Sequence, residues 1–219
     1  MTLHNMPDNK VFNNWKKEFS QENKILSIKN LFKISRNNKY ITRGIDVQFK
    51  YNKKRITRYL LLLGKSVQII PLIFCTTDKK YYSILVEQIR IGAKKKILEF
   101  PSGSVDTKDK SLKEACSRDI DEELNIKVKK KQLFQLSKYP VIMQPVNSYL
   151  KCFFFTFKIK LNKVEMLKLH NKKTGVSSDN EYCLSKVLRL KKIDKLMNDS
   201  SLLGMALLKK KIKIQKKKD

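Results

Sequence analysis

The chain is poor in the residues that several classes of site require. It has two histidines, His4 and His170, which is too few for a histidine-rich zinc site and little to build a Ser-His-Asp triad from. Its four cysteines are far apart, with no C-x-x-C pair, and three of them fall in apolar runs. The cysteines are Cys75, Cys116, Cys152 and Cys183. We therefore expect buried free thiols and a reducing compartment.

Long hydrophobic runs are also missing. The longest apolar stretches, such as residues 59–63 and 152–155, are far too short to span a bilayer. The first ten residues lack the apolar core of a signal peptide. These absences predict a soluble, cytoplasmic protein with no membrane partner, and they leave an organellar address open.

Acidic residues are scarce beside basic ones. There are 20 of the first and 49 of the second, which gives a formal charge of +29. Such a charge is typical of proteins that bind nucleic acid, anionic membranes or phosphorylated substrates. Lysine, however, outnumbers arginine 42 to 7 and is spread along the whole chain. This spread favours a solvated lysine surface over a dedicated nucleic-acid face, so nucleic acid is only a secondary candidate partner.

The length and the hydrophobic periodicity predict an α/β (α+β) fold. A chain of 219 residues, 41% of them hydrophobic, can form one domain with extensions. Helical spacing is found at residues 10–26, 111–124, 162–170 and 193–208, and strand patterns at 41–49, 56–63, 67–74, 82–88, 96–100, 133–137, 150–159 and 182–190. We expect a mixed β-sheet between α-helices. Residues 1–64 would form a helix and hairpin extension for dimerisation, 65–208 the main domain, and 209–219 a lysine-rich disordered tail.

The most informative stretch is the helix-compatible run that begins at Arg118. Asp119, Glu122 and Glu123 stand at i, i+3 and i+4 and share one helical face, beside an apolar line that starts at Leu112. Clustered carboxylates suit hard cations such as Mg²⁺ or Mn²⁺, which neutralise polyphosphate charge. The alternative is a solvated acidic face with i,i+4 ion pairs such as Glu114 with Arg118 and Arg118 with Glu122.

From Gly103 to Ile126 the chain resembles the Nudix box, whose usual form is G-x5-E-x7-R-E-U-x-E-E-x-G-U, with U aliphatic. Asp119 replaces the glutamate after the arginine, and Asn125 replaces the second glycine. Asn125 is expected to adopt the left-handed conformation that glycine supplies there. The stretch before Arg118 is one residue longer than usual. The early glutamate has no clear counterpart among Asp109, Lys110 and Glu114.

Neighbouring segments narrow the resemblance within the Nudix superfamily. Residues 87–91, EQIRI, followed by residues 99–103, EFPSG, look like the E-Q-x-R and E-x-P-A-G signature of ADP-ribose and ADP-sugar pyrophosphatases. Residues 11–26 are similar to the N-terminal helix of plant-type ADP-sugar diphosphatases. The segment from Thr174 to Tyr182 resembles a loop in which this group carries a catalytic or metal-binding glutamate. The resemblance covers most of residues 11–208 and implies a Nudix fold.

The resemblance also implies a reaction, which is Mg²⁺-dependent hydrolysis of ADP-ribose or another ADP-sugar to AMP and a sugar phosphate by a homodimer. The implied roles are as follows: Asp119, Glu122, Glu123 and the Ser102 carbonyl hold Mg²⁺ or Mn²⁺; Glu122 and Glu181 are catalytic; Arg90, Glu87 and Gly103 contact the substrate; Arg118 is structural. Glu181 would act as general base or complete the metal shell.

Two departures keep other functions open. The segment from Pro145 to Leu150 has no carboxylate, although this group usually has acidic residues there, and Asp119 is shorter than glutamate. A Nudix fold that binds a nucleotide but hydrolyses it slowly or not at all is therefore a second hypothesis. A third, from the charge, is a Nudix protein that acts on RNA ends or binds RNA through its lysine tail.

Overall fold

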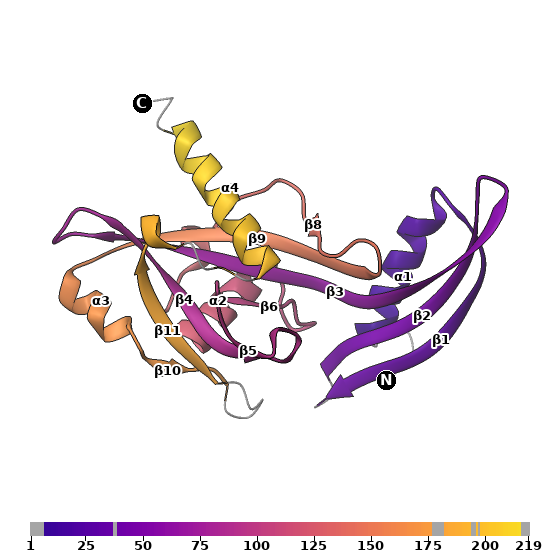
Figure 1. The fold of residues 1–219 in the computed structure, drawn as a ribbon, viewed down its shortest axis with the longest axis horizontal. Coiled ribbons are helices and arrows are strands. Elements are labelled where there is room, and N and C mark those ends of the chain that lie inside the picture. Colours follow the sequence, from indigo (N-terminus) through magenta and orange to yellow (C-terminus); the bar gives the residue numbers. More distant parts are fainter. Residues whose placement is uncertain (1–6, 37–38, 177–181, 194–195, 197, 216–219) are drawn as a thin grey trace. The chain divides into compact units, whose positions relative to one another are not determined.

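The computed structural model describes residues 7–36, 39–176, 182–193, 196 and 198–215 (Figure 1). The chain divides into two compact units. The first comprises residues 1–65, 106–108 and 141–152, and the second comprises 66–105, 109–140 and 153–219. The first unit therefore takes up two segments that lie within the range 65–208, which the sequence assigned to the main domain.

The first unit is a helix on an antiparallel meander. Its elements are α1 (Pro7–Ser20), β1 (Lys24–Arg36), β2 (Lys39–Tyr51), the first half of β3 (Lys54–Cys75), β8 (Val141–Ile142) and the start of β9 (Ser148–Leu161). Asn52 and Lys53 take positive φ values of 48° and 63° in the tight β2–β3 turn, which confirms the predicted hairpin. The predicted helix 10–26 is too long at its end, because Ile25 pairs with Phe49 and belongs to β1.

An aromatic core holds the first unit together. Trp15, Ile45, Val47 and Leu62 are buried, and partly buried residues such as Phe19 pack around them. The Trp15 and Phe19 rings stack with their centroids 5.5 Å apart. The two rings therefore pack into this core.

In its described residues, the second unit contains most of the sheet and the helices α2, α3 and α4. Its elements are the rest of β3, β4 (Tyr81–Arg90), β5 (Lys95–Glu99), β6 (Ser102–Ser104), α2 (Leu112–Leu124), β7 (Phe134–Gln135), the rest of β9, α3 (Lys163–Leu169), β10 (Lys173–Thr174), β11 (Cys183–Arg189) and α4 (Asp199–Gln215), with short 3₁₀ turns η2 (Ile91–Ala93), η3 (Lys130–Gln132) and η5 (Leu190–Lys192). The order β3-β4-β11-β10 forms the path of the sheet. β5 pairs with β4, β6 and β9 pair with β3, and β7 pairs with β9.

Helices α2 and α4 cover opposite faces of this part of the sheet (Figure 1). Because side chains alternate along a strand, Ile69 packs in one core with Cys116 and Ile120 of α2. Its neighbour Ile70 faces α4, where a Cβ on Gly204 would come within 2.9 Å of its Cδ1. The predicted α/β architecture, with a sheet between helices, is confirmed.

Other predicted boundaries also differ from the structure, among them the start of α4, which lies at Asp199 rather than at residue 193. β3 runs through residues 63–67 without a break, because Gly64 adopts a φ of +89° within the strand. β7 has two residues rather than five. α4 extends to Gln215, so the predicted disordered tail is wrong for residues 209–215. The reason is that buried Leu208 and half-buried Ile212 continue the helical spacing of apolar contacts.

Two expectations about absent features can be compared with the structure. All four cysteines are buried, as predicted. None of the helices in the described part of the chain combines the length and the apolar composition that are needed to cross a membrane.

Candidate active site

Helix α2 carries three of the four predicted metal ligands, and both its ends are fixed by local chemistry. The Ser111 side chain accepts a hydrogen bond from the Glu114 backbone N–H and caps the N-terminus. Asn125 ends the helix in the left-handed region, with φ 54° and ψ 45°, and its N–H donates to the Asp121 carbonyl. The predicted conformation of Asn125 is confirmed. The helix bounds therefore follow from the sequence within a residue.

The acidic residues of α2 do not form one solvated face. Asp119 and Glu123 are each only 3% exposed and lie among the buried residues of the helix. The Glu122 side chain, by contrast, is 36% exposed. A buried carboxylate is costly unless charged or polar groups compensate it. The alternative of an ordinary solvated acidic face is thus wrong for Asp119 and Glu123.

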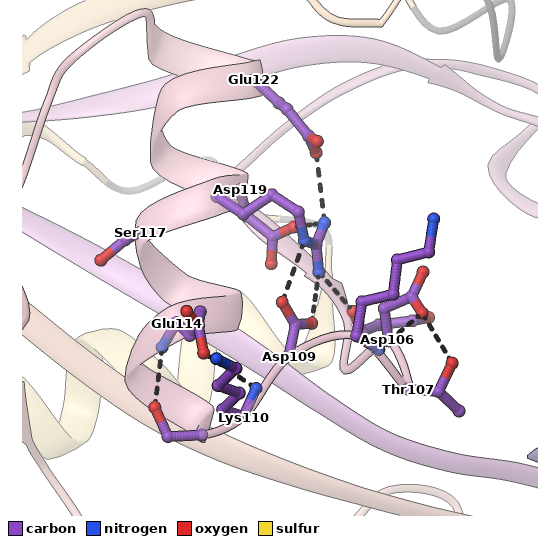
Figure 2. Close-up of polar contacts among 12 residues, drawn as sticks. Asp106, Thr107, Asp109, Lys110, Glu114, Ser117, Asp119 and Glu122 are labelled. Carbon is purple, nitrogen blue, oxygen red and sulfur yellow. Dashed lines mark hydrogen bonds and ion pairs between the residues drawn. The ribbon is translucent and has the colours of Figure 1, made fainter.

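Arg118 forms ion pairs with three carboxylates, those of Asp109, Asp119 and Glu122. Its guanidinium lies 2.6 Å from an oxygen of Asp119 and 3.2 Å from one of Glu122, and it donates to the Ser104 carbonyl at 2.9 Å. Asp109 accepts from Nη2 at 2.9 Å and from Nε at 3.3 Å, one bond to each carboxylate oxygen, so it makes a bidentate contact along one edge of the guanidinium. Figure 2 shows Asp109, Asp119 and Glu122 pointing toward this one group.

The charges around Arg118 stabilise its protonated form. Burial alone lowers the pKa of the guanidinium, but the hydrogen bond to Asp109 and the negative charges of Asp119, Asp109 and Glu122 outweigh burial and raise it. Arg118 therefore remains a permanent cation that ties the loop before α2 to the acids on the helix.

The same contacts show which residue takes the place of the early glutamate in the Nudix box. Asp109 stands six residues after Gly103, as the glutamate does in the usual spacing, and it is the residue that pairs with Arg118. Glu114 instead pairs with Lys130 and accepts from the Lys110 backbone. The predicted i,i+4 pair of Glu114 with Arg118 is therefore not formed. The sequence left this choice open because it depends on how the loop folds onto the helix.

Gly103 lets the Asp119 carboxylate approach the backbone of β6. A Cβ at residue 103 would lie 2.5 Å from both carboxylate oxygens of Asp119, closer than real Cβ contacts. β6 is held in place by pairing with β3, where Gly103 stands opposite Val67 and Ser102 opposite Gln68. The carboxylate is therefore buried beside the Ser102–Gly103 backbone, and glycine is required there for steric reasons.

This donor set has the chemistry of a hard-cation site. Its groups are the carboxylates of Asp119, Glu122 and Glu123 and a nearby backbone carbonyl, all of them oxygen donors, which Mg²⁺ and Mn²⁺ prefer. Among the residues that the structure describes, no three His, Cys, Asp or Glu side chains converge as a ready cage. Asp119 and Glu122 both point to Arg118 instead. The residues fit a divalent cation by the type of their donor atoms.

Arg90 lies in a second polar cluster, centred on Glu99 at the end of β5. Glu99 is fully buried, and its Oε1 accepts from Gln88 Nε2 and Arg90 Nε, both at 2.7 Å. Its Oε2 accepts from Asn198 Nδ2 at 2.9 Å. The Arg90 side chain stays 41% exposed. The EFPSG signature contains Glu99, whose role as the shared acceptor of this cluster is visible only in the structure.

The start of α4 holds the end of β5, the strand that precedes Gly103, in place. The Ser201 hydroxyl accepts from the Phe100 N–H and from Gln68 Nε2, each at 3.0 Å, and all three residues are buried. Asn198 caps this end of α4 by accepting from the Ser201 N–H. Sequence reasoning missed Asn198 and Ser201, because contacts across about a hundred residues leave no local signal.

The remaining predicted site residues are Glu87 and Glu181. Glu87 is half-buried, and by strand alternation it points away from the face on which Val86 packs, so the structure does not bring it to the acids of α2. Thr174 Oγ1 donates to the Glu123 carbonyl at 2.6 Å, and the Gly175 N–H donates to the Glu122 carbonyl at 3.0 Å. The loop thus begins at the C-terminal turn of α2. Glu181 itself lies outside the described residues.

Comparison with protein families identifies the chain. A family model described as Nudt16-like, U8 snoRNA-decapping enzyme-like, matches residues 71–184, which is just over half of the chain and includes α2, Gly103 and Arg118. The chain belongs to the Nudix hydrolase superfamily. The predicted family membership is confirmed.

Individual relatives agree with this assignment. The chloroplastic Nudix hydrolase 14 of Arabidopsis thaliana is 21% identical over 213 residues, which cover 90% of this Nudix chain and 68% of the relative. A crystal structure of an ADP compounds hydrolase aligns with a TM-score of 0.64 at 17% identity, over 89% of this chain and 96% of that one. The Nudix domain of Shewanella oneidensis NrtR, complexed with ADP ribose, aligns with a TM-score of 0.50 at 13% identity, over 68% and 87% of the chains. At these identities the two structures establish the fold.

Proposed function

We propose that this Nudix protein hydrolyses the diphosphate bond of ADP-ribose or a related ADP-sugar, with AMP and a sugar phosphate as products. The observation that carries the proposal is the buried Asp119 carboxylate against the Gly103 backbone, on a helix that also presents Glu122 and Glu123. The names of both structural neighbours support the substrate class, because one is an ADP compounds hydrolase and the other was solved with ADP ribose.

Asp119, Glu122, Glu123 and the Ser102 carbonyl would hold Mg²⁺ or Mn²⁺. When bound, such a cation withdraws charge from diphosphate oxygens and acidifies a water molecule. Arg118 keeps two of these carboxylates at one end of the site, since it contacts both Asp119 and Glu122.

Arg90 would bind a phosphate of the substrate. Glu99 accepts from its Nε and lies 2.5 Å from its Nη2, and this contact orients the guanidinium while other N–H groups of the fork face solvent. Glu87 and the Gly103 backbone are the other proposed substrate contacts. Gly103 adjoins Asp119, whereas Glu87 would have to reach the substrate from the far side of β4.

Glu122, together with Glu181, would serve the proton transfer. The oxygen of the attacking water forms a bond to phosphorus while the bridging P–O bond breaks, and the proton of the water passes to a carboxylate. The hydrogen bonds from Thr174 and Gly175 to the end of α2 support a role for the loop, because they anchor it beside Glu122.

A product-resolved substrate screen tests the proposal. ADP-ribose, ADP-glucose and a capped dinucleotide are incubated with the full chain and Mg²⁺ or Mn²⁺, and the products are separated by chromatography. We expect AMP and ribose 5-phosphate from ADP-ribose. Absence of turnover of every substrate would leave the protein as a nucleotide-binding Nudix fold. Cleavage of the capped dinucleotide alone would indicate that the substrate is a capped RNA end, in line with the description of the matching family.

We further propose that the protein is a homodimer formed through its first unit. β1 is an edge strand, and its Leu31, Phe32 and Ile34 side chains are exposed. Exposed apolar residues on a sheet edge are a liability unless something covers them. Light scattering at micromolar concentration should give twice the mass of the chain, and a monomer would contradict this proposal.

The compartment is proposed as the cytoplasm. An organelle is the alternative, because the plant relative is named as chloroplastic. Fractionation of the source cells decides between them, and recovery of the protein with an organelle would reject the cytoplasm.

A further inference from the structure

One face of the second unit combines exposed aromatic rings with lysines. Residues 127–140 contain five lysines and no Asp or Glu, and α4 has no acidic residue after Asp199. Phe134 is 55% exposed and Tyr139 is 67% exposed. Residues 127–140, together with Lys209, Lys210 and Lys211, are called the lysine–aromatic face below.

Part of the charge of this face is balanced by α2. Lys127 forms an ion pair with Asp121, and Lys130 forms one with Glu114. The exposed lysines at positions 129, 131, 138, 209 and 210 add to it. Lysines thus exceed acids here even after these two pairs are counted, and the face attracts polyanions.

Side-chain contacts bring the end of α4 to β7. Lys211 Nζ donates to the Gln135 carbonyl at 3.2 Å and lies 6.0 Å from the centre of the Phe134 ring. Lys138 Nζ lies 5.2 Å from the centre of the Tyr139 ring. Each exposed ring therefore has an ammonium group beside it, at a distance that allows cation–π attraction.

The two rings stand on ordered backbone. Gln135 Nε2 donates to the Ser137 carbonyl at 2.7 Å, and the Ser137 hydroxyl donates to the Tyr139 carbonyl at 2.8 Å. The Leu136 N–H donates to the Phe154 carbonyl, and Leu133 is fully buried. Because Leu133 already anchors this segment to the core, the exposed ring of Phe134 is not needed for packing.

We propose that the lysine–aromatic face binds single-stranded RNA. Proteins that bind single strands combine a positive surface that follows the phosphates with aromatic rings on which bases stack. Only unpaired bases present their faces to such rings, and the single-stranded loops, bulges and ends of RNA supply such bases. The contacts would be independent of base sequence, because every base has a π face.

An anionic membrane surface is the competing partner. Within residues 127–140 the two rings are the large apolar side chains that the structure exposes, and each has a lysine beside it. A membrane-binding face buries a broad apolar stripe between lipid head groups. Two isolated rings give little area for insertion but suffice for stacking, so the observations favour RNA.

Fluorescence anisotropy with a labelled mixed-sequence RNA of about 12 nucleotides tests this proposal. The titration uses the full chain in EDTA, so the result does not depend on hydrolysis at the proposed active site. We expect binding that weakens between 50 and 200 mM salt. Phe134→Ala and Tyr139→Ala should each lower the affinity about tenfold, from the loss of one stacking contact.

Matched variants separate this face from the general positive charge. Tyr81 is also exposed, with Lys158 Nζ 5.4 Å from its ring centre, but it adjoins the hairpin that contains Asp78. Tyr81→Ala should leave RNA affinity unchanged. Likewise, Lys209→Gln with Lys210→Gln should reduce the affinity and the salt dependence, whereas Lys163→Gln with Lys168→Gln on α3 should not.

Three outcomes would overturn the proposal. One is no RNA binding at 50 mM salt, and a second is an equal loss of affinity from both lysine pairs, which would indicate diffuse charge. The third is binding to vesicles of phosphatidylcholine and phosphatidylserine without binding to RNA. Circular dichroism checks that the exposed-residue variants remain folded.

Discussion

At the scale of single residues, Gly103 has the strictest requirement in the proposed site. In Gly103→Ala the new Cβ would meet both Asp119 carboxylate oxygens at 2.5 Å, so the carboxylate or β6 must move. We expect kcat/KM for ADP-ribose to fall at least tenfold and the free energy of unfolding in urea to decrease. Gly92→Ala is the matched control, because a Cβ there meets no atom within 4 Å. Equal activity in the two variants would contradict the role assigned to Gly103.

Asp109 is predicted to stabilise the fold through Arg118. Asp109→Asn removes one charge from a pair that is mostly buried on the carboxylate side. We expect a loss of about 1–2 kcal/mol in the free energy of unfolding, because hydrogen bonds to charged groups contribute more than neutral ones. Asp121→Asn breaks an exposed pair with Lys127 and should cost roughly 0.5 kcal/mol or less. Urea titrations measure both, and equal losses would argue against the Arg118 network.

Residue roles could be predicted from the sequence where their cause is local. Asn125 ends α2 as expected, because the tolerance of asparagine for positive φ is an intrinsic property. Asp109 could not be chosen over Glu114 before the fold of the loop was known. Glu99 was hidden for the same reason, since its partners come from two distant segments, Gln88 and Arg90 from β4 and Asn198 from the start of α4.

At the scale of elements, the start of α4 supports the strand end that precedes Gly103. Ser201→Ala would leave the Phe100 N–H and the Gln68 side chain without their shared acceptor in a buried site. We expect a cost of about 2–3 kcal/mol, because unsatisfied buried donors lose their hydration without compensation. We also expect a lower kcat/KM for ADP-ribose.

The control for this variant is Ser117→Ala on α2. The Ser117 hydroxyl donates back to the Lys113 carbonyl within the same helix, and such bonds contribute little to stability. Urea unfolding of both variants makes the comparison. A Ser201→Ala protein as stable as Ser117→Ala would show that α4 does not hold the strand end.

The predicted elements agree with the structure where hydrophobic periodicity is strong. α2, α3, β4, β5 and β11 lie within two residues of their predicted bounds. β7 was predicted too long, because only two of its residues find a partner in β9. The helical part of 209–215 was missed, because its lysines suggested a solvated tail while the contact of Lys211 with β7 was unknown.

At the scale of the whole molecule, the division into two units was only partly visible in the sequence. Residues 141–152 join the first unit through long-range pairing, for example the Leu61 N–H with the Asn147 carbonyl. Such pairing depends on which distant strands meet, which periodicity alone does not specify. The net charge of +29 was readable at once, but the clustering of lysines with Phe134 and Tyr139 needed the fold.

The four buried thiols report on opening of the whole molecule. Burial and the negative charge of Asp119 raise the pKa of the Cys116 thiol, and all four cysteines are buried. We expect no reaction with a thiol reagent such as DTNB in native buffer, and four reactive thiols in denaturing urea. Rapid reaction of any thiol in native buffer would show that part of the core opens readily.

We propose that the buried acids of α2 make this Nudix protein a metal-dependent ADP-sugar hydrolase. The decisive measurement is the rate of AMP release from ADP-ribose with Mg²⁺ for the natural protein, for Glu123→Gln and for Glu114→Gln. Glu114 lies on the same helix but pairs with Lys130, so it serves as the control. We expect Mg²⁺-dependent release by the natural protein and Glu114→Gln, and a loss of about a hundredfold or more in Glu123→Gln with its circular dichroism unchanged. An undiminished rate in Glu123→Gln, or no release by the natural protein, would show that the acids of α2 do not have this role.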